Sequence, residues 1–171
     1  MKVTIFGLGL HGGGAAAARY FASRKDEVLV TDIRSASDLE PTRSSLKDLD
    51  AITYRFNAHA IEDISGADVV IKNSAVSWDH PLLSAAQRIE TDLTWMLRSV
   101  KRPIICITGT KGKTTLSYLL HHLLSGTYPD CEVAGNMGIS LFSLHAYETE
   151  APLILELSSW QLRDLRMLGV P

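Results

Sequence analysis

Short apolar runs alternate with segments of helical spacing along most of the chain, which is typical of α/β proteins with parallel sheets. The apolar runs predict buried strands, and the spacing between them predicts helices. The first half yields strands at 2–6, 27–31 and 68–72, with helices at 12–23 and 80–88. Charges and serines break the pattern between residues 35 and 65, so we expect weaker structure there.

The pattern restarts after Lys101-Arg102-Pro103, a polar segment with a proline that predicts a boundary. The second half yields strands at 104–108, 132–134 and 152–157, a helix from 113 to about 124, and another helix after Gly138. A second unit with only three strands would leave a sheet edge poorly covered. We therefore expect the chain to be a fragment of a longer protein.

Composition excludes several classes of protein. The 171 residues are 46% apolar and 21% charged, as in ordinary globular chains, and the net charge is only −2. We expect no nucleic-acid partner, and no membrane partner because no apolar run has the length of a membrane span. Cys106 and Cys131 have no metal-ligand spacing. Cys106 lies in an apolar run and is predicted to be a buried thiol of a cytoplasmic protein.

A glycine-rich loop follows the first predicted strand. Residues 7–12 read Gly-Leu-Gly-Leu-His-Gly, which matches G-x-G-x-x-G, and Asp32 stands at the end of the second strand. Such glycines allow a tight turn and let a phosphate approach the backbone at the start of a helix, while the acid can accept hydrogen bonds from a ribose or base. The loop predicts a nucleotide site; the alternative is a packing turn beside a solvated aspartate.

A second loop, residues 108–115, reads Thr-Gly-Thr-Lys-Gly-Lys-Thr-Thr and joins an apolar strand to an apolar helix. This is the context of a P-loop, in which backbone N–H groups surround phosphates and Lys113 reaches the β and γ oxygens. Thr114 offers a hydroxyl to Mg²⁺, and Glu156, at the end of the last strand, supplies a carboxylate. Ile107 stands where the usual pattern has its first glycine.

Three ordered motifs resemble those of the Mur ligases of peptidoglycan synthesis. They are the loop at 108–115, which in that family lacks the first glycine, the turn Gly135-Asn136-Met137-Gly138, and the segment 156–162, Glu-Leu-Ser-Ser-Trp-Gln-Leu. The last segment is most similar to the branch that adds D-glutamate. The resemblance covers essentially the whole chain. It implies a Rossmann-like domain over 1–98 that binds a UDP-linked substrate, and a truncated P-loop ATP-binding domain over 99–171.

The resemblance also implies roles for individual residues. The implied ATP ligands are Gly109, Thr110, Lys111, Gly112, Lys113, Thr114 and Thr115. The implied ligands of the UDP substrate are Gly9, Leu10, His11, Asp32, Arg34, Ser74, Asn136, Ser158, Ser159 and Gln161. Lys113, Asn136 and Glu156 would be catalytic, with Thr114 and Glu156 at the metal. The family's Ser-Pro-Gly loop is matched here by Ser74-Ala75-Val76.

The implied activity is an ATP-dependent amide ligation, with ATP and Mg²⁺ as cofactors and UDP-N-acetylmuramoyl-L-alanine and D-glutamate as substrates. We expect a monomer, and we expect these 171 residues alone to be inactive. Other hypotheses remain open. An NAD-dependent oxidoreductase would explain the first loop, another Mur-type or folylpolyglutamate-synthase-like ligase would explain the second, and a non-catalytic interaction module would need neither.

Overall fold

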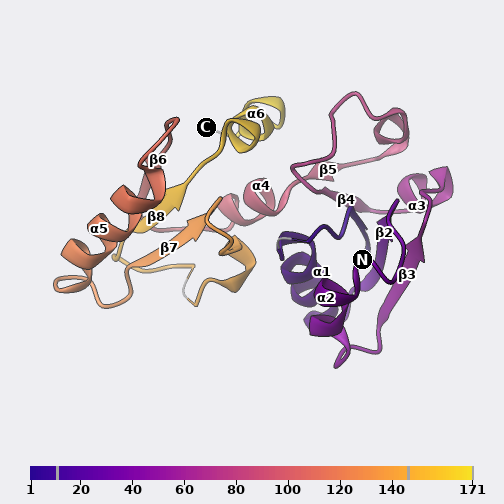
Figure 1. Ribbon diagram of the computed structural model, residues 1–171, viewed down its shortest axis with the longest axis horizontal. Coiled ribbons are helices and arrows are strands. Elements are labelled where there is room, and N and C mark those ends of the chain that lie inside the picture. Colours follow the sequence, from indigo (N-terminus) through magenta and orange to yellow (C-terminus); the bar gives the residue numbers. More distant parts are fainter. Residues whose placement is uncertain (11, 146, 171) are drawn as a thin grey trace. The chain divides into compact units, whose positions relative to one another are not determined.

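The computed structural model describes residues 1–10, 12–145 and 147–170 and divides into two compact units, Met1–Asp92 and Leu93–Pro171 (Figure 1). Both units are α/β, as the alternating pattern predicts. This division falls after the first residue of helix α4, Asp92–Leu97, whereas the one that the sequence suggests follows residue 98. The assignment of 1–98 and 99–171 as functional domains therefore stays a prediction. Each unit is described by itself below.

The first unit is built on a five-stranded, fully parallel sheet in the order β3-β2-β1-β4-β5. Its strands are β1 Lys2–Phe6, β2 Glu27–Asp32, β3 Ile52–Phe56, β4 Val69–Lys72 and β5 Ile89–Glu90. The direction of strand addition reverses between β1 and β4. In open α/β sheets, the crevice outside the carboxyl ends of the strands at such a reversal is where ligands bind.

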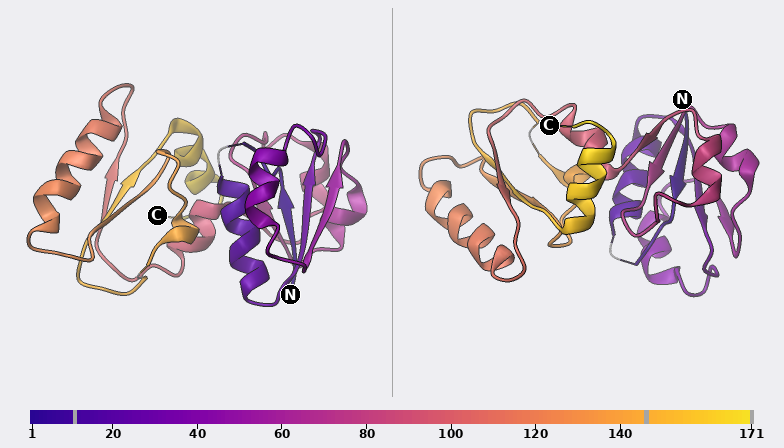
Figure 2. Two further views of the ribbon diagram at one scale, coloured as in Figure 1. Left: turned by 60° about the horizontal axis from the view of Figure 1, so that its bottom comes forward. Right: turned by 90° about the horizontal axis from the view of Figure 1, so that it is seen from above.

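Helices and 3₁₀ turns cover this sheet (Figure 2). They are α1 Gly13–Ser23, α2 Glu40–Arg43, η1 Ser44–Leu46, α3 Ile61–Ser65 and η2 Pro81–Ala85. Helix α1 packs against β1 and β2 through buried alanines, and a Cβ on Gly14 would overlap the backbone of Leu8. Phe6 packs with Ile64 of α3 and Leu83 of η2 in a separate core cluster.

The strands and helix predicted for the start of this unit are confirmed, and two expectations are wrong. The stretch expected to be weak contains β3 and α3, because Ile52, Tyr54 and Phe56 alternate with polar residues on a strand at the sheet edge. The predicted helix at 80–88 is the 3₁₀ helix η2 instead. The chain leaves it at Ala86, in extended conformation, to pair β5 with β4.

The second unit holds a three-stranded parallel sheet in the order β6-β8-β7. Its elements after α4 are β6 Ile104–Ile107, α5 Lys113–Ser125, β7 Glu132–Gly135, η3 Leu141–Ser143, β8 Leu153–Glu156 and α6 Ser159–Met167. The predicted strands and the helix at 113 are confirmed. Where a helix was expected after Gly138, the structure has only the short η3. Ile107, Val133 and Ile154 form a core beneath α5.

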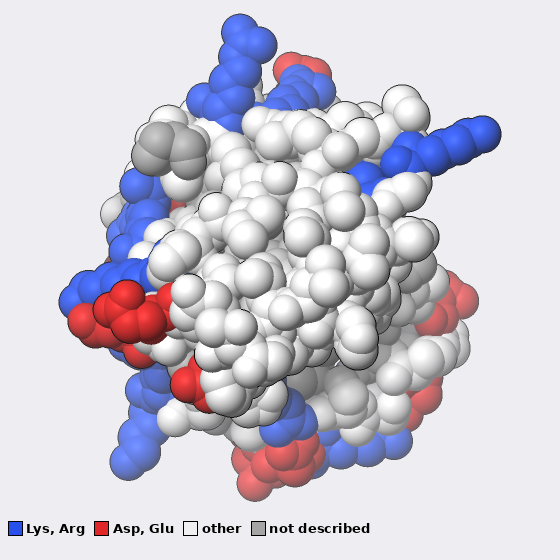
Figure 3. All heavy atoms as spheres, turned by 90° about the vertical axis from the view of Figure 1, so that its left-hand side faces the viewer, with Lys and Arg blue, Asp and Glu red and all other residues white. Residues whose placement is uncertain are grey.

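The prediction that Cys106 is buried is wrong, whereas Cys131 is buried. Strand β6 is an edge strand, and Ile104 and Cys106 are exposed, while Ile105 and Ile107 pack into the core cluster with α5. Helix α5 also exposes apolar side chains, among them Leu119. Figure 3, which faces the side of the second unit with α5 and β6, shows a broad surface of residues that are mostly neither basic nor acidic.

None of the helices within the described residues has the length and apolar character to cross a membrane.

A buried arginine fastens the amino ends of the second sheet. The Arg102 side chain is fully buried just before β6. Its guanidinium donates to the backbone oxygens of Asp130, Ala151 and Pro152, and forms an ion pair of 2.8 Å with Glu132 at the start of β7. One side chain thus ties together the segments that lead into all three strands, in the multidentate geometry that arginine favours.

We predict that Arg102→Met destabilises the second unit by about 3 kcal/mol or more, because it removes the ion-pair partner of the half-buried Glu132 carboxylate and leaves the backbone oxygens of Asp130, Ala151 and Pro152 without this donor. Urea unfolding followed by circular dichroism measures the effect. The matched control is Lys101→Met, since the Lys101 ion pair with Glu148 is largely exposed and should contribute less than about 1 kcal/mol. Equal losses in the two variants would contradict the role given to Arg102.

Candidate functional site

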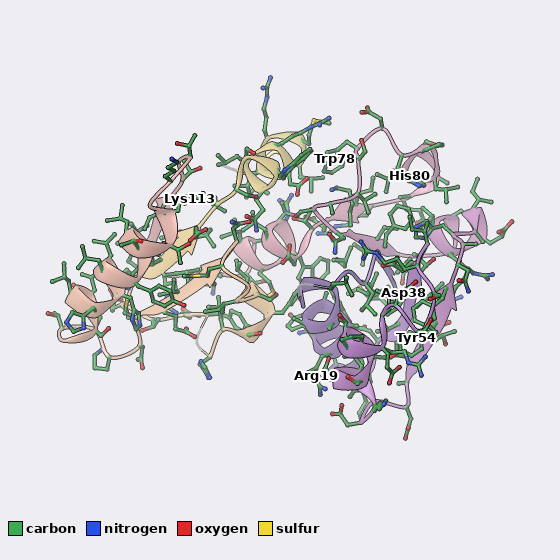
Figure 4. The ribbon with its side chains drawn as sticks, in the orientation of Figure 1. Arg19, Asp38, Tyr54, Trp78, His80 and Lys113 are labelled. Carbon is green, nitrogen blue, oxygen red and sulfur yellow. The ribbon has the colours of Figure 1, made fainter. Side chains whose placement is uncertain are left out.

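The loop between β6 and α5 has the backbone of an anion-binding turn. Gly109 and Gly112 have φ angles of 146° and 75°, which side-chain-bearing residues rarely adopt, and Gly112 leads directly into α5. The N–H groups at the start of this helix and its dipole favour a negatively charged ligand. The Lys113 ammonium donates to the Gly109 carbonyl oxygen at 2.8 Å and so lies over the loop (Figure 4).

Glu156 lies at the centre of the second unit's carboxyl edge. It pairs in register with Ile107 of β6 on one side and with Gly135 of β7 on the other, and it is 2% exposed. Its Oε2 accepts a hydrogen bond of 2.7 Å from the Thr114 hydroxyl, and its Oε1 accepts one of 3.2 Å from the Asn136 amide. Three residues singled out from separate motifs therefore meet in one cluster.

The donor set of this cluster suits a magnesium ion. Carboxylate and hydroxyl oxygens are hard ligands, and Mg²⁺ usually takes one or two protein oxygens and completes its shell with water and phosphate. Within the described ranges no three His, Cys, Asp or Glu residues gather as a metal-binding group. Glu156 and Thr114 thus fit a site that a nucleotide completes.

Gly135 allows the backbone of the turn at 135–138 to lie directly against Glu156. Its φ is 109°, and a Cβ at this position would overlap the Glu156 carbonyl. That same carbonyl accepts a hydrogen bond of 2.9 Å from the Asn136 N–H. The glycine therefore fixes Asn136 beside the carboxylate, which explains in physical terms why the turn has a glycine before its asparagine.

The segment that follows Glu156 serves as the start of α6. Ser158 is the N-cap: its hydroxyl accepts from the Gln161 N–H, and the Gln161 side chain accepts from the Ser158 N–H at 3.0 Å. This is a capping box. Ser159 is exposed, and so is Trp160. Ser158 and Gln161 thus have a structural task whether or not they contact a substrate.

In the first unit, Asp32 closes the glycine loop. It is 4% exposed, and its carboxylate accepts from the Gly9 N–H at 3.2 Å and from the Arg34 N–H at 3.0 Å. The packing-turn alternative assumed a solvated aspartate, but the Asp32 side chain is buried. Leu10 and Arg34 are exposed at the same edge of the sheet. His11 lies outside the described residues.

Asn73 is a neighbour of this loop that the motifs did not reveal. Its amide donates to the Gly7 carbonyl at 3.3 Å, and its amide nitrogen would lie 2.9 Å from a Cβ on Gly9. Its side-chain oxygen accepts from the Ala75 N–H at 3.0 Å, which closes the loop in which the half-buried Ser74 sits. Val76, which stands where the Ser-Pro-Gly pattern has its glycine, has no positive φ, so this loop does not need a glycine there.

Two histidines flank the same edge. The centre of the His59 ring lies 4.3 Å from that of the Phe6 ring, and its Nδ1 lies 2.8 Å from the Thr31 hydroxyl oxygen. The centre of the His80 ring lies 5.8 Å from that of the His59 ring. Burial, followed by the charge of His80, lowers the pKa of His59 below its ordinary value. Sequence reasoning could not find this pair, because neither histidine has a partner at a recognisable spacing.

We predict that Gly135→Ala destabilises the chain by at least about 2 kcal/mol, because a Cβ there meets the Glu156 backbone and the φ angle is unfavourable. Chemical unfolding gives the value. Gly126→Ala is the control, since Gly126 has helical angles and an added Cβ would meet no atom within 4 Å, so that this variant should be neutral or slightly stabilised. Tolerance of alanine at 135 would refute the close approach.

No protein-family model matches the chain. Among curated proteins it is 42% identical, over 96% of its length, to a UDP-N-acetylmuramoylalanine–D-glutamate ligase of Borreliella burgdorferi, of which it covers 37%. It is 43% identical to the ligase of that name from Treponema pallidum and 38% identical to that from Roseiflexus, with 96% and 99% of this chain and 32% and 37% of theirs covered. The resemblance to the Mur ligases is confirmed, and the chain spans about a third of its relatives' length.

Two solved structures share the fold. A murein peptide ligase from Psychrobacter arcticus matches with a TM-score of 0.56 and 15% identity, over 92% of this chain and 38% of its own. The UDP-N-acetylmuramate:L-alanyl-gamma-D-glutamyl-meso-diaminopimelate ligase from Neisseria meningitides matches with a TM-score of 0.55 and 16% identity, over 91% and 51%. The α/β architecture predicted from the sequence is therefore found among Mur ligases.

Proposed function

We propose that this chain carries the nucleotide-binding part of an ATP-dependent ligase that joins D-glutamate to UDP-N-acetylmuramoyl-L-alanine. The observation that carries the proposal is the cluster in which Glu156 holds Thr114 and Asn136 at the end of the phosphate loop. The names of the sequence relatives support the choice of reaction. The activity belongs to a longer polypeptide in those relatives, since this chain covers 37% of the first of them.

The proposed reaction has two steps. The alanine carboxylate attacks the γ-phosphorus of ATP, the bond between that phosphorus and the β–γ bridging oxygen breaks, and ADP leaves with an acyl phosphate as the other product. The amine of D-glutamate then attacks the acyl carbon, the amine loses a proton, and the carbon–oxygen bond breaks to release phosphate. Both steps concentrate negative charge on phosphate oxygens, so positioning and charge neutralisation supply most of the catalysis.

The second unit would supply that neutralisation. The backbone donors of residues 109–112 surround the β and γ phosphates, and Lys113 exchanges its bond to the Gly109 carbonyl for phosphate oxygens. Thr115 lies exposed in the first turn of α5, beside the same donors. Thr114 and Glu156 would hold Mg²⁺, which when bound offsets the charge of the triphosphate. Asn136 keeps the Glu156 carboxylate oriented toward that position.

The first unit would bind the UDP group of the substrate. Gly9, Leu10 and Ser74 face the switch point between β1 and β4, and Asp32 with Arg34 would contact the uracil and ribose. The exposed Ser159 is available to line the muramoyl-peptide site, with Ser158 and Gln161 behind it in the capping box. We propose small-molecule partners only, a monomer, and a cytoplasmic location.

We predict that Lys113→Met weakens ATP binding at least tenfold, because an ammonium close to the phosphates contributes on the order of 1–3 kcal/mol. Titration calorimetry with ATP and Mg²⁺ measures it. Lys101→Met is the control in the same unit, since it removes an exposed ammonium that lies outside the phosphate loop. Unchanged ATP affinity in Lys113→Met would overturn the phosphate-loop assignment.

We also predict that the chain binds UDP-N-acetylmuramoyl-L-alanine and not NAD. A parallel calorimetric titration with the two ligands tests the substrate half of the proposal. Heat with NAD alone would move the first loop to the oxidoreductase class. The Lys113→Met variant should bind the uridine compound as the unmodified chain does, because the two loops lie in different units.

A further inference from the structure

A buried lysine lies at the switch point of the first sheet and has no part in the proposed chemistry so far. Lys72 is the last residue of β4, pairs in register with Phe6 of β1, and is 1% exposed. Among its contacts, the ammonium donates to the Asn73 carbonyl at 3.1 Å and to the Val76 carbonyl at 2.9 Å. It also lies 4.9 Å from the ring centre of Trp78, which Figure 4 labels.

Burying an ammonium group is costly unless the protein replaces its hydration. Two carbonyl oxygens and the face of an indole ring contribute to this here, and both kinds of contact stabilise a positive charge. These three contacts come from the segment 73–78 that follows the strand. The lysine therefore bends this segment back over its own side chain and holds it there.

The segment 73–78, which Lys72 holds in place, packs against the glycine loop at residues 7–9. Asn73 donates to the Gly7 carbonyl, and a Val76 methyl group would lie 3.4 Å from a Cβ on Gly7. The Val76 N–H donates to the Asn73 carbonyl at 2.9 Å, so residues 73–76 close as a turn. Ser74 lies within that turn and is half-buried, and the diphosphate of the proposed substrate would lie beside it.

We infer that Lys72 is a positioning residue for the diphosphate of the UDP substrate: it fixes the turn that presents Ser74 and places a buried positive charge beneath the phosphates. The inference rests on the proposed function of the first unit. A charge in a low-dielectric setting acts more strongly on an anion than an exposed one does. Lys72 therefore matters for a ligand with phosphates and not for the same nucleoside without them.

The test compares UDP with uridine. Lys72→Met keeps an unbranched apolar stem and removes the charge. We expect it to weaken UDP binding to the 171-residue chain by about tenfold while uridine affinity changes less than about twofold. Lys2→Met is the matched control, since this exposed lysine at the opposite end of β1 carries the same formal charge and should leave both affinities unchanged. Lys72→Arg, which keeps the charge, should restore the preference for UDP.

Equal weakening of UDP and uridine in Lys72→Met would reduce the residue to a structural one and overturn the inference. An unmodified chain that binds neither ligand would refute the proposed nucleotide site itself, and the inference with it. A measurement without any variant covers the case in which Lys72→Met does not fold. The ¹⁵N–¹H signal of the Lys72 ammonium in the unmodified chain should shift on addition of UDP and not of uridine, and an unmoved signal contradicts the role.

Discussion

The parallel direction of every strand pairing within the two sheets is the constraint on which the rest of the structure depends. Because parallel strands all end at the same edge, the loops after β1, β2 and β4 meet in the first unit, and those after β6, β7 and β8 meet in the second. Strand order therefore brings together residues that are far apart in sequence, such as the hydrogen-bond partners Thr114 and Glu156. Both candidate sites follow from this geometry.

Buried polar side chains then shape the loops at these edges. Asp32 accepts from the glycine loop, Glu156 accepts from the phosphate loop and from the turn after β7, and Lys72 donates to the turn after β4. Each group is removed from water and finds partners within the chain, which is the condition for burying charge without a large loss of stability. At the opposite end of the second sheet, Arg102 does the same for the segments that enter the strands.

The sequence predicted what depends on local pattern. Apolar runs located β1, β2 and β4, and motif spacing placed Glu156 near the phosphate loop, because strand-end positions follow from strand boundaries. It could not reveal Asn73, whose importance comes from folding back onto Gly7 and Gly9 across the switch point. The sequence does not reveal that Cys106 is exposed, because an apolar run does not say which strand lies at a sheet edge. The spacing of Ser158 and Gln161 matches a capping box, whereas the resemblance implies substrate contacts for both residues.

The bond between the Lys113 ammonium and the Gly109 carbonyl has a further consequence. A free lysine side chain on a surface samples many rotamers, and ordering it costs up to about 2 kcal/mol. In this loop the Lys113 side chain has lost much of that freedom before any nucleotide binds. When a phosphate arrives, the ammonium exchanges the Gly109 carbonyl for a stronger acceptor. The loop is thereby preorganised, and a larger share of the attraction between ammonium and phosphate remains as affinity.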